Sequence, residues 1–156
     1  MNKNLLMALV LGCLILACNS SEKKENKDKA ISEAKVSKVI KEEQSPELIQ
    51  SMKRGKEIYS DFCISCHLPN GKGVLKAFPP LAKSDYLMTN REESIKSIKY
   101  GQSGEITVNG VKYNGVMTPL GLEDKEVADV MNYITNSWGN TNNKLITEKE
   151  VSEIEQ

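Results

Sequence analysis

Apolar residues recur at helical spacing in three parts of the middle of this chain. The first part starts at Ser45-Pro46-Glu47, where serine is a favourable helix cap and proline suits the first helical position. The apolar face that follows is made by Leu48, Met52, Tyr59 and Phe62. Gly55 lies on the same face. Because glycine inside a helix costs about 1 kcal/mol relative to alanine, we expect another backbone to cross closely at this position.

Two further helices and one hairpin are predicted downstream. Asn90 and Glu93 form a capping pair for a short helix that ends before Gly101 and has Ile95, Ile98 and Tyr100 as its apolar positions. A third helix is predicted from about Glu123 to Ser137, with an apolar side made by Val127, Val130, Met131, Ile134 and Trp138. Between them, residues 106–113 predict a small hairpin around an Asn-Gly turn. The pattern indicates an all-α fold with long loops.

The two ends of the chain differ in composition from its middle. All five Tyr, both Phe and the single Trp fall between Ser45 and Asn140, so we expect the folded domain at residues 46–140. Residues 18–45 are rich in Lys, Glu, Asn and Ser and predict a flexible charged tether, and residues 141–156 predict an acidic disordered tail. Leu5–Ala17 is an unbroken apolar run, too short to span a bilayer, which predicts a signal peptide over residues 1–17.

Charge and histidine content narrow the possible functions. Lys plus Arg and Asp plus Glu are balanced at 21 each, which excludes nucleic-acid binding by bulk positive charge. His67 is the single histidine, so any histidine-based triad or metal site must be built around it.

The most specific motif is Cys63-Ile64-Ser65-Cys66-His67, the C-x-x-C-H spacing of c-type haem attachment. Two cysteines one helical turn apart can each bond to a vinyl group of the same porphyrin, and the adjacent histidine then lies under the iron. Three other roles of the cysteines fit less well. A redox dithiol would require a strand-helix setting, and a zinc site would require a fourth ligand. A structural disulfide would leave His67 without a role. We therefore predict one covalently bound haem c.

Further segments resemble a class I (monohaem) cytochrome c. They are Gly55-Lys56-Glu57-Ile58-Tyr59, Pro79-Pro80-Leu81 and Val130-Met131-Asn132-Tyr133. The resemblance covers roughly residues 46–140 and implies a class I cytochrome c fold, with about three to four helices, long loops and a small hairpin around one haem. It also implies that Gly55 packs against Tyr133 where the first and last helices cross, that the Pro79 carbonyl accepts a hydrogen bond from His67, and that Leu81 packs against the haem.

A second axial ligand has to come from a residue other than histidine, and methionine is the common choice in electron carriers. Met52 and Met131 lie on apolar helix faces, where core packing explains them. Met88 lies on a segment that leads into the second helix, whereas Met117 lies on an irregular loop that can fold over the distal side. An open or labile site is the remaining alternative. In class I cytochromes the methionine ligand occupies the position of Met117, so the resemblance implies His67 and Met117 as the iron ligands.

The resemblance implies an electron carrier rather than an enzyme. The chain is similar to cytochrome domains fused to copper nitrite reductases and to dehydrogenases, and we expect it to act as a separate monomeric carrier. The implied partners are redox proteins: a dehydrogenase or quinol-oxidising complex as donor, and a terminal oxidase or reductase as acceptor. The alternative is a haem-based sensor or a peroxidase-like enzyme with a labile distal ligand.

The end of the apolar run, Ile15-Leu16-Ala17-Cys18, resembles the lipobox of bacterial lipoproteins. This resemblance implies cleavage before Cys18, lipid on its sulfur, and export to the periplasmic side of a bacterial membrane. Cys13 is a second candidate, and an ordinary signal peptide with a stray cysteine is the remaining alternative.

Overall fold

The computed structural model describes residues 44–156 of the chain. Two predicted segments lie outside the described residues: the signal peptide (1–17) and residues 18–43 of the tether, which begin with Cys18. Within residues 44–156, none of the helices has the length and apolar character needed to cross a bilayer.

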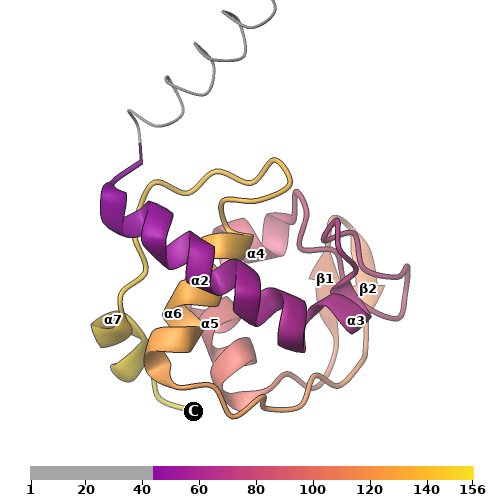
Figure 1. Ribbon diagram of the computed structural model, residues 1–156. Coiled ribbons are helices and arrows are strands. Elements are labelled where there is room, and N and C mark those ends of the chain that lie inside the picture. Colours follow the sequence, from indigo (N-terminus) through magenta and orange to yellow (C-terminus); the bar gives the residue numbers. More distant parts are fainter. Residues whose placement is uncertain (1–43) are drawn as a thin grey trace, which may run out of the picture. The chain divides into compact units, whose positions relative to one another are not determined.

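The described part of the chain is mostly helical (Figure 1). In chain order the elements are α2 (Pro46–Phe62), α3 (Ile64–His67), α4 (Asp85–Thr89), α5 (Arg91–Tyr100), β1 (Ile106–Val108), β2 (Val111–Tyr113), α6 (Asp124–Ile134) and α7 (Glu148–Ser152). The predicted all-α fold with a small hairpin is confirmed. The short helices α3, α4 and α7 were not expected as separate elements.

Helices α2 and α6 cross at Gly55, as expected (Figure 1). A Cβ atom at Gly55 would overlap the backbone carbonyl of Asp129 and would lie 2.9 Å from Cβ of Tyr133. Only glycine lets the two backbones approach this closely. The close crossing and the contact between Gly55 and Tyr133 are both confirmed.

A buried carboxylate joins the same two helices. Asp129 on α6 accepts hydrogen bonds from Ser51 Oγ at 2.6 Å, from Arg54 Nε at 2.6 Å and from Lys125 Nζ at 2.8 Å. Burial by itself raises the pKa of Asp129, but the hydrogen bonds from Arg54, Lys125 and Ser51 outweigh it and hold the pKa below its ordinary value. The ionised carboxylate therefore stabilises the crossing.

The hairpin lies where the Asn-Gly turn predicted it. Strands β1 and β2 pair antiparallel, and Asn109 and Gly110 take the positive φ angles of 51° and 76° that the tight turn requires. The backbone N–H of Asn109 donates to the Asp85 carboxylate at 2.7 Å, and the N–H of Asp85 donates to Asn109 Oδ1 at 3.0 Å. These bonds hold the tip of the hairpin against α4.

The predicted end of the last helix at Ser137 is wrong, since α6 ends at Ile134. The hydroxyl of Thr135 donates to the carbonyl of Met131 at 2.7 Å, and that of Ser137 donates to the carbonyl of Tyr133 at 2.6 Å. The carbonyl of Met131 also keeps its helical bond from the N–H of Thr135 at 3.0 Å, whereas the carbonyl of Tyr133 is satisfied by the Ser137 hydroxyl in place of the N–H that a longer helix would supply. Beyond the helix, the backbone turns at Trp138, which has a φ of 54°.

The prediction of a disordered tail at residues 141–156 is also wrong. The segment packs along α5 and α6, forms α7, and buries Ile146 and Val151 in the core. The side chain of Asn132 on α6 donates to the carbonyl of Ile146 at 2.8 Å and accepts from its N–H at 2.9 Å. The segment is too polar to form a core of its own, but it stays ordered because it uses a face of α6. The folded unit therefore extends to Gln156 instead of ending at Asn140.

Candidate functional site

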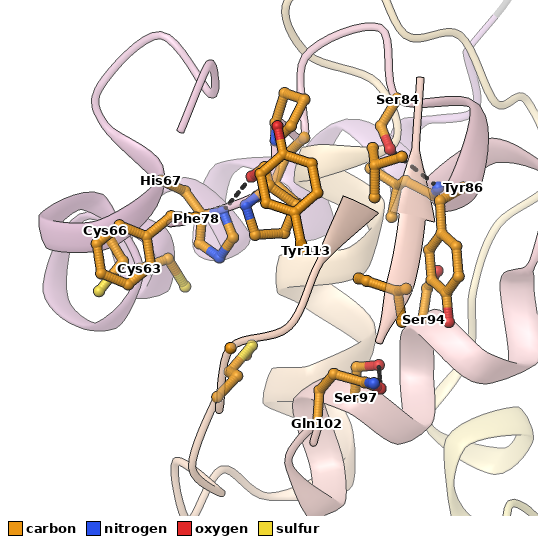
Figure 2. Close-up of a pocket in the computed structure, with 18 of the residues that line it drawn as sticks. Cys63, Cys66, His67, Phe78, Ser84, Tyr86, Ser94, Ser97, Gln102 and Tyr113 are labelled. Carbon is orange, nitrogen blue, oxygen red and sulfur yellow. Dashed lines mark hydrogen bonds between the residues drawn. The ribbon is translucent and has the colours of Figure 1, made fainter. Parts of the chain in front are cut away.

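The end of α2 and the single turn of α3 bring the C-x-x-C-H motif to one wall of a cavity. Cys63 caps both helices, and its carbonyl accepts from the N–H of Cys66 at 3.2 Å and of His67 at 3.0 Å. Figure 2 shows the three side chains on the same side of the cavity. Both thiols are free, and burial, with a smaller contribution from Cys66, raises the pKa of Cys63 to about 11. Reactive redox cysteines have a lowered pKa, so the raised pKa of Cys63 does not activate its sulfur for redox exchange.

His67 is oriented by the loop that follows it. Its Nδ1 lies 2.9 Å from the carbonyl oxygen of Pro79, and because a carbonyl only accepts, Nδ1 carries the proton. Nε2 is then the acceptor, and Figure 2 shows it pointing into the cavity. Burial lowers the pKa of His67, and the hydrogen bond to Pro79 opposes this shift. A neutral imidazole with a free Nε2 lone pair is the form that binds a metal.

Two glycines give the loop between His67 and Leu81 its shape. Gly73 donates to the carbonyl of His67 at 3.0 Å, and a Cβ at Gly73 would lie 2.6 Å from the carbonyl oxygen of Pro79. The carbonyl of Gly71 accepts from the N–H of Leu81 at 2.8 Å. The loop therefore folds back on itself and turns the Pro79 carbonyl toward the histidine.

The cavity contains about 1060 Å³ of empty space, including its mouth open to solvent. Its walls are mainly apolar and come from α3, α5, α6, the hairpin and the loop after it. Of the predicted site residues, the cavity brings together Cys63, Cys66, His67, Pro79, Leu81 and Met117. Met88, the other candidate ligand, is 37% exposed and does not line the cavity.

Several polar cavity residues on and after α5 were not predicted from the sequence. Ser94 is buried against the cavity, and its hydroxyl has no hydrogen-bond partner within residues 44–156. Ser97 Oγ donates to Gln102 Oε1 at 3.1 Å, and both residues line the cavity (Figure 2). Ser94 and Ser97 interrupt the apolar face that Ile95 and Ile98 define, which is the signal that could have identified them.

The residues present fit a covalently bound haem. Two thiols one helical turn apart, a neutral imidazole and a thioether line one apolar cavity, which is the donor set of c-type haem proteins. An unpartnered buried hydroxyl costs about 1–3 kcal/mol, so the Ser94 hydroxyl fits a cavity that holds a group with polar atoms.

Comparisons with known proteins point to the same group. The cytochrome c family model matches residues 52–138. Cytochrome c-552 of Thermus thermophilus is 40% identical over 109 residues, which cover 64% of this chain and 82% of that protein. The cytochrome c subunit of the quinone alcohol dehydrogenase of Gluconobacter oxydans is 25% identical over 114 residues, which cover 64% of this chain and 21% of the subunit.

The family match covers more than half of the chain and includes both the attachment motif and the loop that carries Met117. The fold described above, mostly helical with one small antiparallel hairpin, is consistent with the class I cytochrome c fold. The chain therefore belongs to the cytochrome c family, which binds haem c covalently, and Cys63 and Cys66 have the spacing that this attachment requires.

Proposed function

We propose that this protein carries single electrons between redox partners, with His67 and Met117 as the axial ligands of one haem c. The observation that carries the proposal is that both residues line one apolar cavity together with the two cysteines. When bound, the haem supplies an iron atom that takes up and releases one electron. With His67 and Met117 in both axial positions, a substrate could not reach the iron without displacing a protein ligand. This arrangement favours a carrier over an enzyme.

The surrounding residues would set the redox properties of the site. The Pro79 carbonyl fixes the ring of His67 and makes the imidazole a stronger donor. A methionine ligand raises the reduction potential, and the apolar walls, including Leu81, Ile98 and Val130, keep water from the centre. We therefore expect a positive reduction potential.

The mouth of the cavity is the surface through which partners would exchange electrons. Phe78 and Val116 line the mouth and are 39% and 74% exposed, and Leu75 in the same loop as Phe78 is 70% exposed. The chain has a formal net charge of zero, so apolar contact rather than long-range charge steering would guide docking. The donor would be a dehydrogenase or a quinol-oxidising complex, and the acceptor a terminal oxidase or reductase. The similarity to cytochrome subunits of quinone alcohol dehydrogenases supports a dehydrogenase as donor.

The proposed location is the periplasmic side of a bacterial membrane, with lipid attached to Cys18. The apolar run Leu5–Ala17, which ends directly before Cys18, supports this location. Because a single acyl chain binds only marginally, stable anchoring would need more than one chain. Radioactive palmitate should label the mature wild-type protein but not the Cys18→Ser variant. Equal labelling of the two proteins would exclude the anchor at Cys18.

The axial ligand can be tested by the spectrum of the oxidised holoprotein. The wild-type protein should show a methionine-to-iron(III) charge-transfer band, and Met117→Ala should abolish the band and lower the reduction potential. Met88→Ala is the matched control, because Met88 is exposed and does not line the cavity. Loss of the band in Met88→Ala instead would refute the assignment. A wild-type protein with high-spin iron that binds cyanide or peroxide rapidly would favour the sensor or peroxidase-like alternative.

A further inference from the structure

The backbone of Met117 is held by the residue that follows α5. Met117 lies in a loop without regular secondary structure, where it forms an isolated antiparallel bridge with Gln102. The N–H of each residue donates to the carbonyl of the other at 2.8 Å. Gly101 has a φ of 86°, and a Cβ there would lie 2.7 Å from the carbonyl oxygen of Met117. The position of Met117 therefore depends on where α5 ends.

The last turn of α5 is in turn held by the C-terminal segment, residues 141–156. The hydroxyl of Tyr100 donates to the carbonyl of Ile154 at 2.8 Å. Lys99 Nζ donates to the carbonyl of Val151 at 2.9 Å and forms an ion pair with Asp124 at 2.9 Å. These bonds tie the end of α5 to the C-terminal segment and to the start of α6.

The same segment is anchored to the core and to the other end of α5. Ile146 and Val151 are buried in the main apolar cluster. At the start of α5, Arg91 makes two hydrogen bonds to the Glu150 carboxylate, at 2.6 and 2.8 Å. The segment is therefore a fixed part of the fold that contacts α5 at both ends, with only one of these contacts next to the residues that hold Met117.

We propose that residues 141–156 act as a brace that positions Met117 as an axial ligand. The brace fixes the last turn of α5 through Tyr100 and Lys99, and the bridge between Gln102 and Met117 carries this constraint to the ligand. The inference rests on the proposed ligation by Met117. It gives the C-terminal segment a role at the redox centre in addition to its contribution to stability.

The test compares two variants of the full-length holoprotein that loosen opposite ends of the brace. Tyr100→Phe keeps the ring and removes the hydroxyl that donates to Ile154. Arg91→Gln removes the paired hydrogen bonds to Glu150, at a distance of about 13 Å along the helix from Tyr100. Both variants weaken the attachment of the segment, but only Tyr100→Phe does so beside the bridge to Met117.

We expect Tyr100→Phe to speed cyanide binding to the oxidised protein about fivefold, the change that corresponds to loss of one hydrogen bond. Its charge-transfer band should also disappear on heating before the far-UV circular dichroism changes. In Arg91→Gln the rate of cyanide binding should stay at the wild-type value. On heating, the temperature at which the charge-transfer band disappears and the temperature at which the far-UV circular dichroism changes should differ by the same amount as in the wild-type protein. Equal cyanide rates in the two variants would show that the segment supports the fold and does not position Met117.

Amide hydrogen exchange separates failure of the brace from failure of the proposed ligand. In Tyr100→Phe the amides of Gln102 and Met117 should exchange faster than in Arg91→Gln, whichever residue binds the iron. If Met117→Ala keeps the charge-transfer band, the ligand assignment fails and the positioning proposal fails with it, even if exchange shows that the loop is braced. If exchange at the two amides is unchanged in Tyr100→Phe, the brace is refuted while Met117 can still be the ligand.

Discussion

Replacement of Gly55 by alanine is expected to destabilise the fold, although alanine is the better helix former. Helix preference alone would favour alanine in the middle of α2 by about 1 kcal/mol. The new Cβ would overlap the carbonyl of Asp129 and would lie 2.9 Å from Cβ of Tyr133. Backbone and Cβ atoms cannot rotate away, so α2 and α6 would have to separate.

The magnitude follows from what the separation disturbs. Overpacking of a well-packed interior costs about 1–3 kcal/mol. The bond from Ser51 Oγ to Asp129, 2.6 Å long and buried, spans the crossing, and its loss would add about 1 kcal/mol. After subtraction of the gain in helix preference, the net loss is about 1–3 kcal/mol in the free energy of unfolding. For a domain of this size the loss lowers Tm by about 4–12 °C.

Urea and thermal unfolding of the holoprotein, followed by far-UV circular dichroism, would measure this loss. Lys56→Ala is the matched control, because Lys56 is the next residue of α2 and is exposed. Its stability should stay within about 0.5 kcal/mol of the wild-type protein. A Gly55→Ala variant as stable as the wild-type protein would refute the reasoning, because it would mean that the two helix backbones are not in contact.

Three further variants test other parts of the structure. The pKa of Asp129 is lower in the folded protein than in the unfolded chain, where it is about 3.9. The contribution of this carboxylate to stability is therefore complete above about pH 3.9 and is lost as the pH falls through the pKa of the folded protein. Asp129→Asn should therefore be less stable at neutral pH and lose less stability in acid, as measured by urea unfolding across a pH series. Ile146→Ala should cost about 2–5 kcal/mol if the C-terminal segment is part of the core, and a change near zero would contradict that placement. Gly73→Ala should displace the Pro79 carbonyl, weaken its hydrogen bond to His67 and raise the reduction potential measured by voltammetry, whereas an unchanged potential would mean that the loop adapts.

The elements that the sequence predicted correctly depend on residues close to one another in the chain. Ser45 accepts a hydrogen bond from the N–H of Leu48 at 3.1 Å, so the start of α2 is decided within one helical turn. The hairpin is likewise decided by Asn109 and Gly110, which take the positive φ angles of its turn. Gly55 predicted the helix crossing because glycine in a helix is locally unfavourable and needs a contact elsewhere to explain it.

The predictions that were wrong concern segments whose contacts come from residues far away in the chain. Residues 141–156 lack aromatic residues and cannot bury enough surface alone, but Asn132 and the apolar face of α6 supply the missing half of their contacts. The composition of a segment indicates how much apolar surface it can bury by itself. It does not indicate how much apolar surface the segment can bury against a neighbouring element. The predicted end of the last helix placed Trp138 on that helix's apolar side, but its ring packs against Gly71, a contact between distant parts of the chain that the local pattern does not show.

The same distinction applies to the site. Covalent chemistry requires a fixed spacing of Cys63, Cys66 and His67, so the motif could be read without knowledge of the fold. The bridge between Gln102 and Met117 joins residues on either side of the hairpin, and nothing in their local sequence indicates that they meet. A spacing rule can therefore predict which atoms bind a cofactor. The rigidity with which those atoms are held is a tertiary property, and in this protein it requires the structure of the loop after α5.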